Sequence, residues 1–129
     1  MLSPLIFNLF INELPNVFIN DPRNANFCDP VFIKNEALNC LMWADDCAIF
    51  SRCESGIQNC INIASDFFNS QGLHVNVKKT KLMVFNVKGL GSKNFANFNF
   101  TLGGSPLEMC ESYTYLGLVF RPSASGKYL

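Results

Sequence analysis

The stretch LMWADDCAIF at residues 41–50 is apolar except for two adjacent carboxylates, Asp45 and Asp46. An ionised carboxylate is costly to bury unless a partner compensates its charge, so the pair has to lie where the chain turns into solvent or where a cation binds. The short apolar runs on either side are typical of buried strands. The stretch therefore predicts a two-stranded antiparallel hairpin, over about residues 39–44 and 47–51, with both carboxylates at its tip.

The carboxylate pair has two interpretations. Aspartate is a favoured turn residue because its side chain accepts hydrogen bonds from nearby backbone amides, so an ordinary hairpin turn explains the pair without a ligand. However, common two-residue turns place Gly or Asn where positive φ is needed, and this turn offers neither. Two carboxylates about 4 Å apart also repel by roughly 4 kcal/mol at an effective dielectric constant of about 20. A divalent cation would relieve that repulsion, and Mg²⁺ is usually held by one or two carboxylates together with substrate phosphates.

Helices are expected on both sides of this hairpin. A Ser-Pro pair at residues 3–4 starts one helix, which should stop or kink near Pro15 because proline lacks a backbone donor. A loop rich in Asn, Asp and Pro follows, with one short strand at residues 31–33. Residues 54–70 carry the clearest helical pattern of the chain, and Gly72 follows as a helix stop. The apolar stripe of that helix consists of Ile57, Cys60, Ile61, Ala64, Phe67 and Phe68.

The second half of the chain predicts mainly strands. Apolar patterns at residues 73–77 and 81–87 indicate two strands that flank a basic turn. Gly103 and Gly104 indicate a hairpin, and residues 113–120 indicate one more strand. The elements together predict an α+β fold in which helices pack on one face of a mainly antiparallel sheet.

Composition narrows the class of protein. With 49% hydrophobic and 16% charged residues, the 129-residue chain can form one domain with a core. It shows no secretory leader and no apolar run long enough to cross a membrane, so an intracellular protein of the cytoplasm or nucleus is expected. The six cysteines lack C-x-x-C spacing and are expected to be reduced, and a single histidine, His74, argues against a zinc site. Residues 67–107 contain lysines and no acid, so this segment either faces a polyanion or forms a solvated surface.

Four stretches of the chain, in order, resemble the motifs of reverse transcriptases. LMWADDCAIFS resembles the Y/F-x-D-D motif, with the alanine that is typical of non-LTR retrotransposons and group II introns. LSPLIFNLFINELP resembles the second half of motif B, GLHVNVKKTKLMVF is similar to the motif D region, and YTYLGLVF resembles motif E, the strand hairpin that grips the primer. The motif D residues on the usual pattern are Gly72, Leu73, Asn76, Lys79, Thr80 and Phe85. Because the four motifs cover most of residues 2–120, the chain is identified as a partial reverse transcriptase domain of the non-LTR type.

The resemblance implies an incomplete polymerase palm from an RNA-directed DNA polymerase, with an RNA template, a DNA primer and deoxynucleoside triphosphates as partners. In the full-length parent, Asp45 and Asp46 would bind two Mg²⁺ ions about 4 Å apart for nucleotidyl transfer. Lys79 would contact or protonate the pyrophosphate leaving group, and an ordinary solvated lysine on a turn is the alternative. The residues implied in contacts with primer, template and nucleotide are Trp43, Phe10, Asn12, Tyr115, Leu116 and Gly117.

The sequence also departs from the family pattern. Trp43 replaces the usual Tyr or Phe, and Met1 stands where motif B would be running, so a truncated copy or an internal methionine read as a start is expected. The motif A aspartate, the fingers and the thumb are absent from residues 1–129. We therefore expect the chain alone to be inactive, with no third carboxylate within about 5 Å of the pair, weak Mg²⁺ binding at most, and an unpaired sheet edge. Two alternatives stay open: a non-catalytic remnant that binds nucleic acid, and a purely structural α+β domain with an acidic turn.

Overall fold

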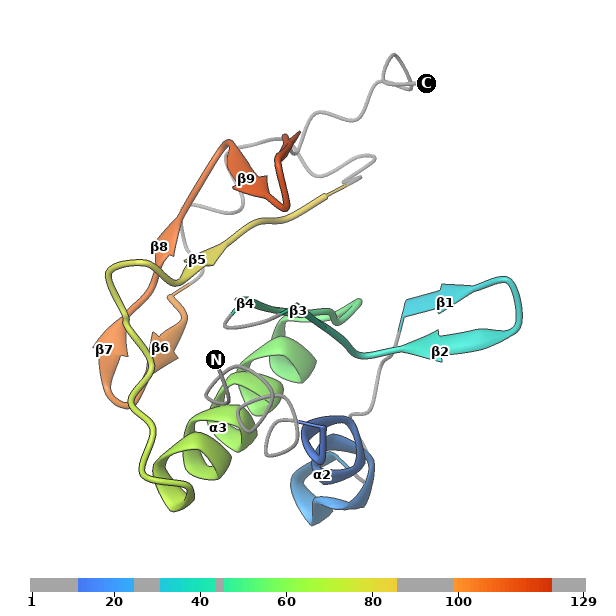
Figure 1. Cartoon of the computed structure of the whole chain (residues 1–129), viewed down its shortest axis with the longest axis vertical. Coiled ribbons are helices and arrows are strands. Elements are labelled where there is room, and N and C mark those ends of the chain that lie inside the picture. Colours follow the sequence, from blue (N-terminus) through green and yellow to red (C-terminus); the bar gives the residue numbers. More distant parts are fainter. Residues whose placement is uncertain (1–11, 25–30, 44–45, 86–98, 122–129) are drawn as a thin grey trace, which may run out of the picture. The chain divides into compact units, whose positions relative to one another are not determined.

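The computed structural model describes residues 12–24, 31–43, 46–85 and 99–121 (Figure 1). The chain divides into two compact units, Met1–Val75 and Asn76–Leu129. The described elements of the first unit are α2 (Leu14–Asn20), the 3-10 turn η1 (Pro22–Asn24), β1 (Val31–Ile33), β2 (Glu36–Leu38), β3 (Cys40–Trp43), β4 (Asp46–Ile49) and α3 (Glu54–Ser70). Those of the second unit are β5 (Lys81–Leu82), β6 (Thr101–Leu102), β7 (Ser105–Pro106), β8 (Glu108–Met109), β9 (Tyr113–Tyr115) and β10 (Leu118–Phe120).

The predicted hairpin in the first unit is confirmed. Strands β3 and β4 pair antiparallel, with Cys40 opposite Ile49 and Trp43 opposite Asp46. Opposed residues of an antiparallel pair lie on the same face of the hairpin, and successive residues alternate between the two faces. The pairing therefore puts Cys40 and Ile49 on one face and Asp46 on the other.

Helix α3 is confirmed over the whole predicted range. It begins after Cys53, whose sulfur accepts a hydrogen bond from the backbone N–H of Gly56 at 3.3 Å. At its end Gly72 takes φ +73°, and its N–H donates to the carbonyl of Asn69, while the N–H of Leu73 donates to the carbonyl of Phe68. This is the paired hydrogen-bond pattern that satisfies the last carbonyls of a helix, and it explains why the chain stops at the predicted glycine.

The buried face of α3 differs from the predicted stripe. Ile63 is 1% exposed and lies in the core, whereas Ile57, which was predicted to be buried, is only half-buried. Ile61 is buried but is not part of the core cluster that faces the hairpin. Most of the predicted stripe still faces the core, because Cys60 and Ala64 lie in the cluster and Phe67 and Phe68 pack against it, and Ile63 joins them.

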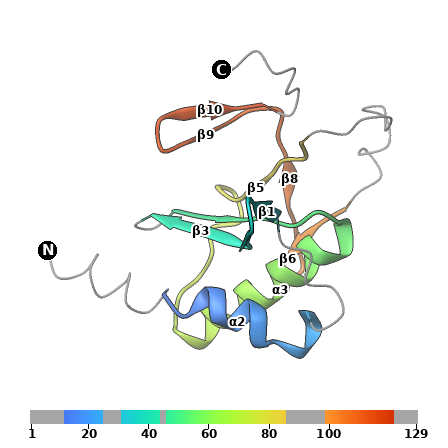
Figure 2. The same cartoon turned by 90° about the vertical axis from the view of Figure 1, so that its right-hand side faces the viewer.

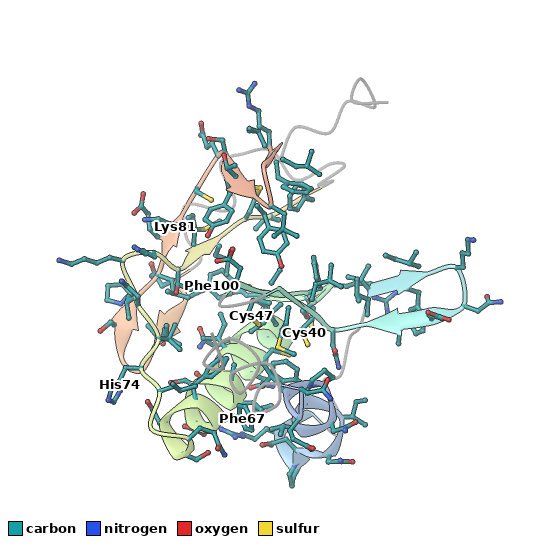
Figure 3. The ribbon with its side chains drawn as sticks, in the orientation of Figure 1. Cys40, Cys47, Phe67, His74, Lys81 and Phe100 are labelled. Atoms are coloured by element: carbon teal, nitrogen blue, oxygen red, sulfur yellow. The ribbon has the colours of Figure 1, made fainter. Side chains whose placement is uncertain are left out.

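Helix α2 contributes the other side of the core. Leu14 and Phe18 are both 0% exposed and belong to one cluster with the inward face of α3 and with Cys40 of the hairpin. Figure 2 shows α2 and α3 together on one side of β3–β4. Cys40 of the cluster and Phe67, which packs against it, are labelled in Figure 3. The helices therefore cover one face of the hairpin, as the sequence predicted for the fold in general.

Pro15 lies at the beginning of α2, where the sequence predicted the end or a kink of an earlier helix. It occupies the first turn, in which backbone N–H groups have no intrahelical partner, so the missing donor costs nothing there. The continuation of helix to Asn20 was not predicted. The predicted helix start at residues 3–4 lies outside the described residues.

A short hairpin precedes the central one. The predicted strand at residues 31–33 is confirmed as β1, and it pairs antiparallel with β2, which the sequence did not predict. The turn between them places Lys34 at φ 57°. Because a lysine in the left-handed region gives no turn signal in a sequence, the partner strand could not be anticipated.

A cluster of charges ties η1 to α3. Arg23 donates from Nε and Nη2 to the carboxylate of Asp21, at 3.0 and 2.9 Å, and from Nη1 to Asp66 of α3 at 2.7 Å. The side-chain amide of Asn59, also on α3, donates to the backbone carbonyl of Arg23 at 3.5 Å. The hydrogen bond from Arg23 lowers the pKa of Asp21.

The second half of the chain differs from the prediction in several strands. Residues 73–77 contain no strand, although their exposure alternates as predicted, and of the strand predicted at residues 81–87 only β5 forms within the described residues 81–85. Strand β5 pairs in parallel with β8, and the Lys81 ammonium donates to the Glu108 carboxylate across this pair. An alternating pattern decides which side chains face inward, but a strand also needs a hydrogen-bonded partner, which the pattern does not identify.

Two tight hairpins complete the second unit. The predicted hairpin at Gly103 and Gly104 is confirmed as β6–β7, and both glycines have positive φ. The single strand predicted from the apolar pattern at residues 113–120 is wrong, because β9 and β10 form a hairpin whose turn is Leu116 and Gly117. A strand hairpin is what the resemblance of these residues to motif E implied. In the described residues every sheet is two-stranded, so the structure is α+β with small, mainly antiparallel sheets instead of one continuous sheet.

Candidate functional site

The end of the β3–β4 hairpin carries the described member of the carboxylate pair. Asp46 is the first residue of β4, lies opposite Trp43 and is exposed. It shares its face with the pair of Leu41 and Ala48, and Leu41 is 47% exposed, so this face is the one that the helices leave uncovered. Asp45 lies outside the described residues. Asp46 therefore begins an otherwise apolar strand, and its carboxylate is exposed to solvent and not buried.

The donor chemistry at this hairpin fits a hard cation. A carboxylate oxygen is a preferred ligand of Mg²⁺, and an exposed carboxylate at a strand end leaves room for water and substrate phosphates as further ligands. Within the described ranges, no three His, Cys, Asp or Glu side chains gather as a metal-binding group.

A capped turn in the second unit presents Lys79. The backbone N–H of Lys79 donates to both the carbonyl and the side-chain oxygen of Asn76, at 3.2 and 3.3 Å. Thr80 donates from its backbone N–H and from Oγ1 to the same carbonyl, at 3.1 and 2.8 Å. Three of the six residues on the motif D pattern are therefore joined in one turn, and the Lys79 side chain is exposed on it.

The β9–β10 hairpin holds three of the residues implied in primer contact. Tyr115 ends β9 and is half-buried, while Leu116 and Gly117 form the turn with φ values of 52° and 79°. Leucine in the left-handed region is uncommon, since its Cβ crowds the backbone there. Leu116 is also 52% exposed, so a strained turn holds an apolar side chain in solvent. Backbone strain of this kind concentrates at functional sites.

Of the two remaining predicted residues, Phe10 and Asn12, the structure describes one. Asn12 is described as an exposed turn residue just before α2, and Phe10 lies outside the described residues. The structure brings Asp46 opposite Trp43 in one register pair, and it brings Tyr115, Leu116 and Gly117 into one hairpin. Asp46 belongs to the first unit and Lys79 to the second.

Among the described cysteines, Cys40 lies in the hairpin and is buried in the core. Burial raises the pKa of Cys40 to about 11, and the neighbouring Cys60 thiol adds to this rise. A thiol with such a pKa stays protonated at neutral pH and is a poor nucleophile. The described cysteines, all of them free, are Cys40, Cys47, Cys53, Cys60 and Cys110.

One contact of chemical interest was missed by sequence reasoning. The guanidinium of Arg52, just before α3, lies over the ring of Phe32 on β1. The patterns that predict helices and strands relate residues close together in the chain, so they could not pair Arg52 with Phe32. The only signal in the sequence was an aromatic residue, Phe32, on a predicted strand.

Neither described helix combines the length and the apolar character that crossing a membrane requires.

Comparison with known proteins identifies the family. The model of the family described as reverse transcriptase (RNA-dependent DNA polymerase) matches residues 1–120. No curated protein and no solved structure matches the chain. The match spans the hairpin with Asp46, the turn with Lys79 and the whole of β9–β10. The chain therefore belongs to the reverse transcriptase (RNA-dependent DNA polymerase) family.

Proposed function

We propose that this chain forms part of the palm of an RNA-directed DNA polymerase from a non-LTR retrotransposon, from the second half of motif B to motif E. The observation that carries the proposal is the β3–β4 hairpin, which exposes Asp46 at its end, directly after Asp45, in a chain of the reverse transcriptase family. A buried sheet face holds this hairpin against two helices, so the carboxylate end has a rigid base.

Asp45 and Asp46 are the proposed ligands of Mg²⁺. When bound, Mg²⁺ would activate the primer 3′ hydroxyl and stabilise the negative charge of the nucleotide triphosphate. Asp46 supports this role with an exposed carboxylate on the face that the helices do not cover. The Trp43 position beside it is proposed to lie near the primer end.

Lys79 is proposed to hold a proton for the pyrophosphate leaving group. The Asn76 cap fixes the turn through the backbone of Lys79 and Thr80, so the lysine side chain starts from a defined position. An ammonium group placed near a leaving phosphate can neutralise developing charge or donate a proton from Nζ.

The β9–β10 turn is proposed to contact the primer through Tyr115, Leu116 and Gly117. Gly117 allows close approach of another backbone because it has no Cβ, and no atom of the described residues lies within 4 Å of the position that a Cβ would take. Phe10 and Asn12 are proposed to flank the template and the nucleotide.

A complete polymerase needs parts that these 129 residues are not expected to supply. The motif A aspartate, the fingers and the thumb of the polymerase are proposed to come from segments other than these 129 residues. The chain alone is then expected to show no polymerisation, since a two-metal site needs more anionic ligands than one carboxylate pair.

Primer extension tests the proposal. The chain would be joined to the motif A, fingers and thumb segments of a related element, and extension of a DNA primer on an RNA template would be measured with Mg²⁺. Asp46→Asn and Asp45→Asn should each reduce the rate by at least about 100-fold, because each removes charge from the metal site. Glu36→Gln is the matched control, since it removes an exposed carboxylate from the neighbouring hairpin and should leave the rate unchanged. Near-normal extension by both aspartate variants would place the catalytic carboxylates elsewhere.

A second candidate function is the binding of nucleic acid without chemistry. It is favoured by Lys78 and Lys79, which are both exposed in a segment, residues 67–107, that contains no acid. If the assembled protein binds RNA in a salt-dependent way but extends no primer, this second function replaces the first. Replacement of both lysines by glutamine should then lower the slope of binding against salt by about two.

A further inference from the structure

The backbone carbonyl of Asn76 is the acceptor on which the turn of Lys79 closes. It accepts from the N–H of Lys79 at 3.2 Å, from the N–H of Thr80 at 3.1 Å and from the Thr80 hydroxyl at 2.8 Å. Both N–H groups have a second acceptor, the Asn76 side chain for Lys79 and the Val77 carbonyl for Thr80. Shared N–H bonds of this kind are individually weak, and the hydroxyl makes the shortest of the three bonds to the carbonyl. The Thr80 hydroxyl is therefore the contact that holds the turn most closely.

Thr80 is also joined directly to an anchored strand. Strand β5 begins at the next residue, Lys81, and pairs in parallel with β8 (Figure 1). The Lys81 ammonium donates to the Glu108 carboxylate, and the N–H of Cys110 donates to the Leu82 carbonyl at 3.0 Å. Leu82 is 8% exposed, so β5 is held by packing as well as by pairing. The Thr80 hydroxyl thus ties the start of the turn to a strand that is fixed in the second unit.

The backbone of the turn decides where the Lys79 ammonium can lie. The Lys79 side chain is exposed, so packing does not restrict its rotamers. A lysine ammonium stands on a flexible four-carbon stem, and the region it reaches is set by the position of its Cα and the direction of its Cβ. Both depend on the backbone angles of Lys79, which the bonds to Asn76 hold. A looser turn would spread the ammonium over a larger volume.

We propose that Thr80 is a positioning residue for Lys79, whose hydroxyl closes the turn on Asn76 and so directs the lysine ammonium toward the pyrophosphate leaving group. This inference deepens the proposed function and rests on it. Thr80 acts only through Lys79 and does not itself touch the nucleotide. Its contribution is geometric, and misplacement of a reacting group by about 1 Å can lower a rate by up to about 100-fold.

Hydrogen exchange in the 129-residue chain tests the hydroxyl bond without any catalysis. Thr80→Val removes the hydroxyl donor, so the Lys79 amide should exchange faster by about threefold or more, measured by NMR. Thr80→Ser keeps the donor and should restore the exchange rate of the unmodified chain. Ser70→Ala is the matched control, because it removes a hydroxyl that donates to the Phe67 carbonyl at 2.6 Å at the end of α3. It should leave the exchange of Lys79 unchanged.

A double-mutant cycle in the assembled polymerase tests whether Thr80 acts through Lys79. Thr80→Val should lower kcat for primer extension by about tenfold and leave KM for the nucleotide unchanged, since the lost positioning matters only in the transition state. Thr80→Ser should keep kcat within about twofold of the unmodified protein. In a Lys79→Gln background, Thr80→Val should cause no further loss, because the group that it positions is already absent.

Three results would overturn the positioning role. Unchanged exchange of the Lys79 amide in Thr80→Val would show that the hydroxyl does not hold the turn. Faster exchange with normal kcat would confine the hydroxyl to the local fold, and an additive loss in the Lys79→Gln background would make Thr80 act independently of the lysine. Loss of extension in Asp46→Asn and Lys79→Gln but not in Thr80→Val would remove only this inference. Normal extension in Asp46→Asn would instead remove the proposed function, while the exchange measurement would still report on the hydroxyl bond.

Discussion

Two regions of the chain, the core cluster of the first unit and the β9–β10 hairpin of the second unit, are stabilised in different ways. In the first unit, Leu14, Phe18 and Ile63 are fully buried, and helices α2 and α3 supply all three. In the second unit, the β9–β10 hairpin leaves Val119 and Phe120 exposed by 57% and 40%. Its strands are connected by turns with positive φ. Packing therefore holds the end of β3–β4 in place, whereas turn geometry holds the proposed primer contact.

Truncation of the largest core side chain should break the first unit. Phe18→Ala removes a ring that is 0% exposed, and the resulting cavity should lower the free energy of unfolding by about 3–5 kcal/mol. Urea unfolding followed by circular dichroism measures this, since the helices lie in the first unit. The matched control is Phe120→Ala in β10, where the exposed ring should cost less than about 1 kcal/mol. Equal losses in the two variants would contradict the contrast between the core cluster and the β9–β10 hairpin.

The next largest effect is expected in the turns of the second unit. Gly104 has φ +83°, and no atom of the described part of the chain lies within 4 Å of where a Cβ would be, so Gly104→Ala should cost only the backbone strain of about 1–2 kcal/mol. The amide of Leu107, which donates to the carbonyl of Phe100 at 2.8 Å, reports on this hairpin. Its hydrogen exchange should accelerate by at least about fivefold, while Ser105→Ala should leave it unchanged. Unaltered exchange in Gly104→Ala would show that the turn does not limit the stability of this hairpin.

Relief of strain in the other turn should stabilise it. Leu116 sits at φ 52°, and asparagine tolerates this conformation better, so Leu116→Asn should raise stability by about 0.5–1 kcal/mol. In the assembled polymerase the same variant should weaken primer binding, since it removes the exposed apolar side chain. Hydrogen exchange of the hairpin and primer affinity measure the two effects. A variant that is less stable and binds primer normally would assign the leucine to packing.

The smallest effect concerns the charges that tie η1 to α3. The Arg23 side chain is 43% exposed, so solvent screening limits its ion pairs with Asp21 and Asp66 to about 1 kcal/mol or less. The pKa of Asp21 is lowered in the folded chain, so this contribution is present above the ordinary pKa of 3.8 and is lost as the pH falls through the folded value. Unfolding free energies at pH 6 and pH 3 should therefore differ less in Asp21→Asn than in the unmodified chain. An equal pH dependence in both would place the acid-sensitive groups elsewhere.

Local signals in the sequence predicted the elements that depend on neighbouring residues. The hairpin from Cys40 to Ile49 follows from apolar runs around a polar turn, and α3 follows from its helical period and its glycine stop. The hairpin at Gly103 and Gly104 follows from two residues that tolerate positive φ. These features need no information about distant parts of the chain.

The missed features depend on pairing partners or on uncommon backbone conformations. Strand β2 pairs through a turn with Lys34 in the left-handed region. The apolar pattern also missed the β9–β10 pairing through Leu116 in the same region, although the resemblance to motif E implied a hairpin there. The burial of Ile63, which the predicted stripe of α3 did not include, depends on how α2 packs against α3. For the site, the sequence predicted the hairpin end with Asp46, but the Phe32–Arg52 contact joins separate elements and leaves no local pattern.

The parallel pairing of β5 with β8 imposes an order of assembly on the second unit. The two-residue turns of β6–β7 and β9–β10 close small loops, and hairpins of this kind form within about 1–10 μs. Joining Lys81 to Glu108 instead closes a loop with a sequence separation of 27 residues, whose chain entropy is lost before any contact compensates it. Formation of β6–β7 first would shorten that loop, because it lies between the two strands. During synthesis, β5 therefore stays unpaired until the later strands have been made. Its edge remains open to pairing with other chains until β8 has formed.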